Sequence, residues 1–176
     1  MSIFAESGQP RQTRESQVMD LYDRLRPSLF SYLTGLGLTL NEAEDVIHDS
    51  FIKLFDHLAI QESDSNLRGW LFRVAHNLAM DLFREARRIG QSDPDGVNLQ
   101  EFMIDPSFSP EEQAIKNEEI RNVMSALGRL PPQQRSAVLL RSENLRYREI
   151  AAMLGVSTKR ASELIQRALV RLTGDL

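Results

Sequence analysis

The sequence predicts an all-α protein made of two small helical domains joined by a flexible linker. Nearly every apolar stretch repeats with the period of an α-helix, and the alternation typical of β-strands is hard to find. The seven prolines and nine glycines mostly stand between these stretches rather than inside them. Helices are expected at residues 14–34, 41–58, 66–88, 110–128, 132–142, 147–154 and 158–172.

The boundary between the two domains is expected at residues 89–109. This acidic segment is rich in glycine, proline, serine and aspartate and has no helical period, as is typical of a tether. Residues 1–88 would form the N-terminal domain and residues 110–176 the C-terminal domain. A capping box at Asn41 and Glu44 would begin the second helix of the N-terminal domain.

The net charge of −4 conceals two basic segments. Residues 67–88 hold five basic and two acidic side chains, and residues 129–176 hold nine basic and four acidic ones. Residues 41–66 and 89–128 are strongly acidic. Binding of nucleic acid depends on local patches of charge rather than on the total, so this distribution agrees with two separate DNA-contacting parts.

Several classes of protein are disfavoured by what the sequence lacks. Without cysteine the chain forms neither a disulfide framework nor a thiolate metal site, and we expect no metal or cofactor. The first 16 residues hold no apolar core of signal-peptide length, and no run approaches the ~20 apolar residues of a membrane span. We therefore expect a cytoplasmic protein without membrane insertion.

Residues 147–166 fit the pattern of a helix-turn-helix. Apolar contacts between the two crossed helices fall at Ile150, Leu154, Val156, Ala161 and Leu164. Gly155 stands at the turn, where glycine adopts a left-handed backbone most easily, and the next helix would point its N-terminal end into the major groove. Candidate DNA-contacting residues here are Arg146, Arg148, Ser157, Thr158, Lys159, Arg160, Ser162, Glu163, Gln166 and Arg167. An ordinary helical hairpin with a polar outer face is the alternative.

This region resembles the C-terminal domain of sigma-70 family transcription initiation factors, which binds the promoter −35 element. The matching residues are Leu130, Pro131, Arg135, Glu149, Ile150, Ala151, Leu154, Gly155 and Ser157. The last helix departs from the family pattern, because Ser162, Leu164 and Leu169 replace residues that are commonly basic. Arg146 and Arg148 also differ, and cations at a helix N-terminus cost ~0.3–1 kcal/mol each. That cost makes sense if both arginines meet DNA phosphates.

Residues 66–88 predict a second DNA-facing helix. Its apolar face, expected in the core, carries Leu71, Val74, Ala75, Leu78 and Leu82. The opposite face is basic, as suits a helix that follows phosphates and touches bases. The candidate DNA-contacting residues are Arg73, Asn77, Arg84, Arg87 and Arg88, with His76 at the margin. The alternative is a charged face that only contacts water. The excess of three positive charges in residues 67–88 disfavours this alternative.

The same helix resembles the −10 recognition region of sigma factors. The matching residues are Arg68, Trp70, Leu71, Arg73, Ala75, Asn77, Asp81 and Arg84. We expect Trp70 to pack against the protein rather than to stack on a base, and Asp81 to hold nearby arginines. The preceding residues 59–66 match in position the family's loop that captures a flipped −10 base.

The expected helix at residues 41–58 adds a protein-binding surface. Its core stripe consists of Ile47, Phe51, Leu54, Phe55 and Leu58. Its other face resembles the segment with which sigma factors dock on the clamp helices of the RNA polymerase largest subunit. The residues that would bind polymerase are Asp45, His48, Asp49 and Ile52. His48 replaces a common glutamine, which would add some pH sensitivity to the contact.

Together these resemblances imply an extracytoplasmic-function sigma factor rather than an enzyme. Its implied partners are core RNA polymerase, promoter DNA and an anti-sigma factor. One alternative is a mimic that titrates an anti-sigma factor without binding promoters. A metal-dependent hydrolase built on the His48-Asp49 pair lacks further ligands at suitable positions. A dimeric helix-turn-helix repressor would leave the polymerase-like and −10-like segments unexplained.

Overall fold

The computed structural model describes residues 9–60, 66–90 and 110–174, and within these ranges the chain forms helices and turns but no strand. The helices are α1 (Gln9–Leu36), α2 (Leu40–Ile60), α3 (Leu67–Arg88), α4 (Pro110–Gly128), α5 (Pro132–Ser142), α6 (Tyr147–Leu154) and α7 (Thr158–Gly174). The expected all-α class is confirmed. None of the helices in the described ranges has the length and apolar character of a membrane span. The expected tether falls almost entirely on residues 91–109, outside the described ranges.

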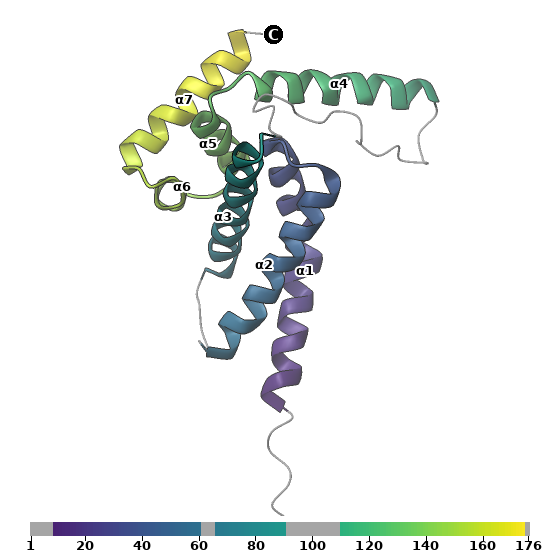
Figure 1. Cartoon of the computed structure of the whole chain (residues 1–176), viewed down its shortest axis with the longest axis vertical. Helices are drawn as coiled ribbons and strands as arrows, with labels where there is room; N and C mark the ends of the chain where they lie inside the picture. The colour runs from purple at the N-terminus through teal and green to yellow at the C-terminus, as the bar shows by residue number, and fades with distance from the viewer. Residues whose placement is uncertain (1–8, 61–65, 91–109, 175–176) are drawn as a thin grey trace, which may run out of the picture.

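The N-terminal domain is a bundle in which α1, α2 and α3 pack against one another (Figure 1). Each helix places large side chains in the common core, because their apolar residues recur with the helical period. The fully buried residues include Leu29, Tyr32, Leu33, Ile47, Leu54, Leu71 and Phe72. The bundle therefore holds one face of α2 and one face of α3 inward and leaves their other faces to solvent.

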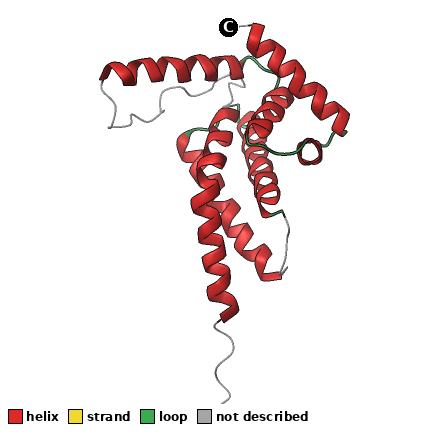
Figure 2. Ribbon diagram, turned by 180° about the vertical axis from the view of Figure 1, so that it is seen from behind, coloured by secondary structure: helices red, strands yellow, loops and turns green. Residues whose placement is uncertain are grey.

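The C-terminal domain is built from α5, α6 and α7, and α4 extends sideways from it (Figures 1 and 2). Leu140, Ile150 and Ala161 are fully buried where these three helices meet. The end of α4 packs in a second, smaller cluster, in which Met124, Leu127, Leu130 and Ala168 are buried.

The start of α2 differs from the sequence-based expectation. The backbone N–H of Thr39 donates to Glu42 Oε2 at 2.8 Å, and the N–H of Glu42 donates to Thr39 Oγ1 at 3.2 Å. This reciprocal pair is a capping box two residues before the predicted one. Glu44, the predicted partner of Asn41, forms an ion pair with Arg26 of α1 instead.

The inward face of α3 also differs from the prediction. Phe72, Ala75 and His76 are buried, whereas Leu82 is 39% exposed. Val74 and Leu78 are only half-buried. The helix is thus rotated about its axis relative to the predicted core stripe, and its inward side follows the spacing of Phe72, His76 and Ala79.

The two domains pack against each other and share one continuous hydrophobic cluster. The buried guanidinium of Arg135 in α5 donates to the carbonyl oxygens of Leu127 at 2.8 Å, Gly128 at 2.6 Å and Leu36 at 3.3 Å. Leu36 ends α1, so one side chain caps the C-terminal ends of helices from both domains. The sequence-based division into domains did not anticipate this contact.

Candidate nucleic-acid interface

The outward face of α3 carries the predicted basic residues. Arg73, Asn77, Arg84, Arg87 and Arg88 are all exposed. Arg84 pairs with Asp81, as expected for that aspartate, and Arg88 pairs with Glu85 at 2.6 Å. Arg73 and Arg87 form no ion pair with any residue in the described ranges. These two guanidinium groups are therefore available to an incoming phosphate without breaking a pair.

His76 is not part of this face, and the prediction that it contacts DNA is wrong. The side chain is 5% exposed, and its Nδ1 atom lies 2.7 Å from the hydroxyl oxygen of Tyr32 in α1. Burial lowers the pKa of His76 to about 4, so the imidazole is neutral at pH 7. Its spacing of four residues from Phe72 places it on the buried side of α3. His76 is a core residue that links α3 to α1.

Trp70 packs against the protein, as the sequence predicted. Its ring stacks on that of His57 in α2, with centroids 4.5 Å apart and planes 20° from parallel. His57 was not identified from the sequence, because it stands 13 residues away and no local pattern joins the two. Residues 61–65 of the expected base-capturing loop lie outside the described ranges. Asn66, at the end of that segment, caps α3 by accepting the N–H of Gly69 at 3.0 Å.

The helix-turn-helix has the predicted geometry. Gly155 ends α6 with a φ of 65°, the left-handed conformation that glycine adopts most readily. Ser157 Oγ then accepts the N–H of Arg160 at 3.1 Å and caps α7. Ala161 and Leu164 are buried and hold α7 against α5 and α6. This local chemistry fixes which side of α7 faces outward.

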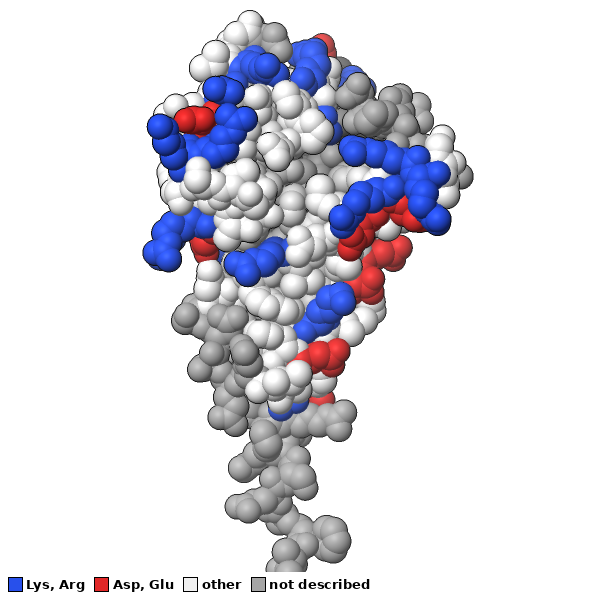
Figure 3. Space-filling model, turned by 60° about the vertical axis from the view of Figure 1, so that its left-hand side comes forward, with Lys and Arg blue, Asp and Glu red and all other residues white. Residues whose placement is uncertain are grey.

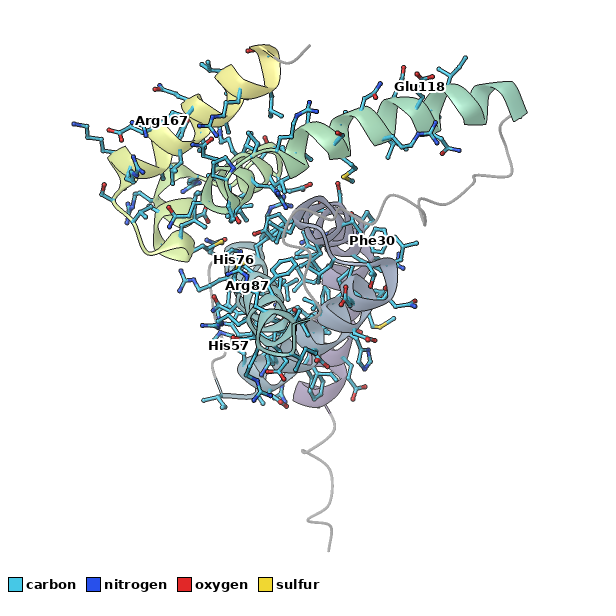
Figure 4. All side chains as sticks on the ribbon, turned by 45° about the horizontal axis from the view of Figure 1, so that its top comes forward. Phe30, His57, His76, Arg87, Glu118 and Arg167 are labelled. Atoms are coloured by element: carbon cyan, nitrogen blue, oxygen red, sulfur yellow. The ribbon has the colours of Figure 1, made fainter. Side chains whose placement is uncertain are left out.

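The predicted contact residues of this region divide by exposure. Those exposed are Arg146, Arg148, Ser157, Thr158, Lys159, Gln166 and Arg167. Arg160, Ser162 and Glu163 are half-buried, and Arg160 pairs with Glu163 at 3.3 Å. Figure 4 labels one basic residue of each helix, Arg87 on α3 and Arg167 on α7. Figure 3 shows groups of basic side chains around the wider end of the molecule, with uncharged surface between them.

The outward face of α2 is acidic around one apolar residue. Asp45, His48 and Asp49 are exposed, and Ile52 is 49% exposed. Neither aspartate forms an ion pair within the described ranges. The described residues include no group of three or more histidine, aspartate or glutamate side chains that could hold a metal ion. This face therefore offers a small apolar contact beside two carboxylates, suited to a basic protein surface.

Comparison with known proteins explains why these three faces occur in one chain. The family described as Sigma-70 region 2 matches residues 21–89, and the family described as Sigma-70, region 4 matches residues 120–172. The sigma factor EcfG of Rhodopseudomonas palustris, described as an ECF RNA polymerase sigma factor, is 27% identical over 90% of this chain and 88% of EcfG. The chain is an extracytoplasmic-function member of the sigma-70 family. The region 2 match contains the acidic face of α2 and the basic face of α3, and the region 4 match contains the helix-turn-helix.

Two curated sigma factors are similar to this chain over most of its length. It is 30% identical to the RNA polymerase sigma factor NccH of Alcaligenes xylosoxydans xylosoxydans. The matched region covers 81% of the present chain and 77% of NccH. It is 27% identical to the sigma factor RfaY of Xanthomonas campestris pv. campestris, covering 88% of this chain. Only 40% of RfaY is covered, so the chain spans less than half of that relative.

Solved sigma factor structures have the same fold. CnrH in complex with the cytosolic domain of CnrY is 25% identical, with a TM-score of 0.66 over 94% of this chain and 91% of the other. RpoE from Bartonella quintana, in complex with the anti-sigma factor NepR, is 23% identical, with a TM-score of 0.70 over 91% of this chain and 96% of the other. Both alignments include the region 2 and region 4 domains.

Proposed function

We propose that this sigma factor binds core RNA polymerase and directs initiation at promoters by contacting the −10 element with α3 and the −35 element with α7. The observation that carries the proposal is the presence of two exposed basic helices in separate domains of one sigma factor. A lone DNA-binding module requires only one of them. The acidic face of α2 is a third surface. Neither α3 nor α7 needs it for binding DNA, which leaves it for the contact with polymerase.

At the −10 element, the arginines of α3 can contact the DNA backbone, and one amide side chain can contact a base. Arg73 and Arg87 are exposed cations without an ion pair among the described residues, so they can neutralise phosphates directly. Arg84 and Arg88 are held by aspartate and glutamate three residues away, and such exposed pairs are weak enough to exchange for phosphate. The amide of Asn77 can pair with a base edge.

At the −35 element, the start and outward side of α7 would enter the major groove. Thr158, Lys159, Gln166 and Arg167 are exposed along it, and glutamine pairs well with adenine. Arg146 is the N-cap of α6 and Arg148 lies in its first turn, and both suit contacts to phosphates. Ser162 and Glu163 are half-buried, so they can reach bases only if the major groove fits closely around α7.

The polymerase contact is proposed for the outward face of α2. Ile52 would supply the apolar contact, and Asp45 and Asp49 would meet basic groups of the clamp helices. His48 can donate or accept one hydrogen bond at the same surface. We further propose an anti-sigma factor as a regulatory partner and the cytoplasm as the site of action. The sigma factor RpoE, a structural neighbour, forms such a complex with NepR.

The proposal is tested by in vitro transcription with bacterial core polymerase on a genomic promoter library. We expect initiation at a defined set of promoters. Arg87→Glu and Arg167→Glu should each abolish it while the proteins still bind core polymerase. Arg24→Glu, at an exposed position of α1, makes the same charge change away from both basic helices and should leave initiation intact.

The polymerase-binding face has its own matched pair of variants. Ile52→Glu should weaken binding to core polymerase at least tenfold, because it places a charge in the apolar centre of the contact. Met19→Glu, which changes an exposed apolar residue of α1, should bind as the unaltered chain does. Absence of polymerase-dependent initiation from every promoter would overturn the proposal, and tight binding to an anti-sigma factor alone would then favour the mimic.

A further inference from the structure

The first half of α4 carries an exposed apolar side chain among glutamates. Ile115 is 60% exposed, and in Figures 1 and 2 this part of α4 lies apart from the other helices. The residues three and four positions before and after it are Glu111, Glu112, Glu118 and Glu119, spacings that are neighbours on one side of a helix. Glu118 and Glu119 are exposed, and neither forms an ion pair within the described ranges. Figure 4 labels Glu118 on this part of α4. We call Ile115, Glu118 and Glu119 the α4 face.

The cations and the packing residues of α4 lie on other sides of the helix. Lys116 and Arg121 come one and six positions after Ile115, which places them about 100° or more around the helix axis from it. Met124 and Leu127, through which α4 packs on the rest of the C-terminal domain, are about 120–180° around the axis from Ile115. The α4 face is therefore acidic and is not used by the packing of its own domain.

The last turns of α7 present the opposite combination of groups. Leu169 and Val170 are 48% and 71% exposed. Arg167 and Arg171 are exposed beside them, and neither forms an ion pair in the part of the chain that the structure describes. Leu169 stands where the family commonly has a basic residue, and its apolar side chain offers nothing to a DNA phosphate. We call these four residues the α7 end, which is apolar and flanked by positive charge.

The α4 face and the α7 end complement each other but cannot meet within one chain. Leu127 packs in the same cluster as Ala168 of α7. Ile115 lies 12 residues before Leu127, which is about 18 Å along the helix. The α4 face is therefore held away from the α7 end of its own chain. A partner must supply the opposite surface, and a second copy of the chain carries both.

Pairing of identical surfaces is disfavoured by charge. Two α4 faces would bring together the glutamates of both copies, and two α7 ends would bring together their arginines, so like charges would repel. Contact of an α4 face with an α7 end instead sets two carboxylates against two guanidinium groups around apolar side chains. Two-fold symmetry repeats this contact once, which closes the assembly at two copies.

We propose that two copies of the chain form a dimer in which the α4 face of each covers the α7 end of the other. The contact hides the far end of the proposed −35 surface, because Gln166 and Arg167 lie one helical turn before Val170 on the outward side of α7. Only this consequence rests on the proposed function. Two contacts between helices make a small interface, so we expect a dissociation constant of roughly 1–100 µM.

The association is measured by sedimentation equilibrium of the free full-length chain over a wide range of protein concentrations. We expect a monomer–dimer equilibrium that weakens as salt is added, because salt screens exposed charges. Ile115→Glu should weaken the dimer by roughly tenfold or more, since it places another carboxylate in the contact. Ile89→Glu makes the same change just after α3, at a residue that is 53% exposed, and should leave the dimer unchanged. A monomer at every concentration would overturn the proposal.

An exchange of charges identifies the two surfaces. One variant carries Glu118→Arg/Glu119→Arg, and the other carries Arg167→Glu/Arg171→Glu. Each variant alone sets like charges against each other in both contacts and should be monomeric. An equal mixture should form a heterodimer, because one contact then has the native charges and the other has them reversed. Either variant remaining dimeric, or a mixture that stays monomeric, would rule out the pairing of the α4 face with the α7 end.

Matched controls carry the same charge changes on other helices. Asp20→Arg/Asp23→Arg alters exposed residues of α1, and Arg24→Glu/Arg87→Glu alters exposed residues of α1 and α3. Each control alone should dimerise as the unaltered chain does. Loss of the dimer in either control would show that net charge drives the association, and it would overturn the assignment to the two surfaces.

The masking of the −35 surface is tested with the duplex of a promoter found in the transcription assay. Added duplex should convert the dimer into complexes that contain one protein chain. Ile115→Glu leaves α7 intact and should bind the duplex more tightly than the unaltered chain only at concentrations where the latter is dimeric. Dimers that bind the duplex as well as monomers do would overturn the masking. Failure to find any promoter would count against the proposed function, whereas the charge exchange decides the dimer without DNA or polymerase.

Discussion

The imidazole of His76 and the phenol of Tyr32 share a buried hydrogen bond, with 2.7 Å between Nδ1 and the hydroxyl oxygen. It joins α3 to α1 in the centre of the N-terminal bundle. Burial disfavours the charged form of both groups, which lowers the pKa of His76 to about 4 and raises the pKa of Tyr32 above its usual value. The pair is therefore neutral wherever the protein is folded at physiological pH.

Tyr32→Phe should destabilise the protein by about 1–2 kcal/mol. The substitution keeps the ring and removes the hydroxyl, so a buried nitrogen of His76 loses its partner. Urea unfolding at pH 7 measures the change. Tyr22→Phe, at a half-buried ring that packs on Phe51, provides the control and should cost less than 0.5 kcal/mol. Equal losses in the two variants would mean that the hydrogen bond is not what stabilises the pair.

His76 should also make stability depend on pH. Its pKa is about 4 in the folded chain, against about 6.5 for an unperturbed histidine, so the unfolded chain binds the proton more tightly. The stabilisation is complete above pH 6.5 and is lost as the pH falls toward 4, reaching a loss of about 2 kcal/mol at pH 5. The free energy of unfolding, measured from pH 8 to pH 5, should show this decline.

Two variants test whether His76 causes this decline. His48→Gln changes an exposed imidazole and should retain the decline. The double variant Tyr32→Phe/His76→Leu removes both partners and should flatten it, with little cost at pH 7 because no buried polar group is left unpaired. An unchanged decline in the double variant would assign it to a different group.

The helix-turn-helix could be predicted in detail because its determinants are local. The apolar spacing, Gly155 in the turn and Ser157 as a cap all lie within a few residues of one another, and each has the predicted geometry. The exposed face of α2 was predicted for the same reason. Periodicity alone decided that Asp45 and Asp49 face away from Ile47.

What the sequence did not reveal depends on contacts between distant residues. His76 was placed at the margin of the basic face because a polar side chain on an amphipathic helix is usually exposed. Its partner Tyr32 lies 44 positions away, and Asn66 and Glu149 are 83 positions apart. No helical period links such pairs. The capping box lies two residues before the predicted one, and Glu44 forms an ion pair with Arg26 of a different helix.

Gly155→Ala should destabilise the C-terminal domain by about 1–2 kcal/mol. A Cβ atom there meets no neighbour within 4 Å, so the cost comes from the left-handed backbone alone. Gly174→Ala, also in open space but without a positive φ, should be neutral and is the matched control. Hydrogen exchange of α6 and α7 distinguishes the two variants. Equal protection in both would show that the turn relaxes without cost.

Arg87→Gln should reduce the salt dependence of promoter binding by the polymerase complex. An exposed cation that neutralises one phosphate releases about one counterion, so the slope of log K against log salt should become less steep by roughly 0.7–0.9. Affinity should fall for all promoter sequences alike, because phosphate contacts carry no base information. Arg24→Gln on α1 should leave both slope and affinity unchanged. A loss confined to certain −10 sequences would instead assign Arg87 to base recognition.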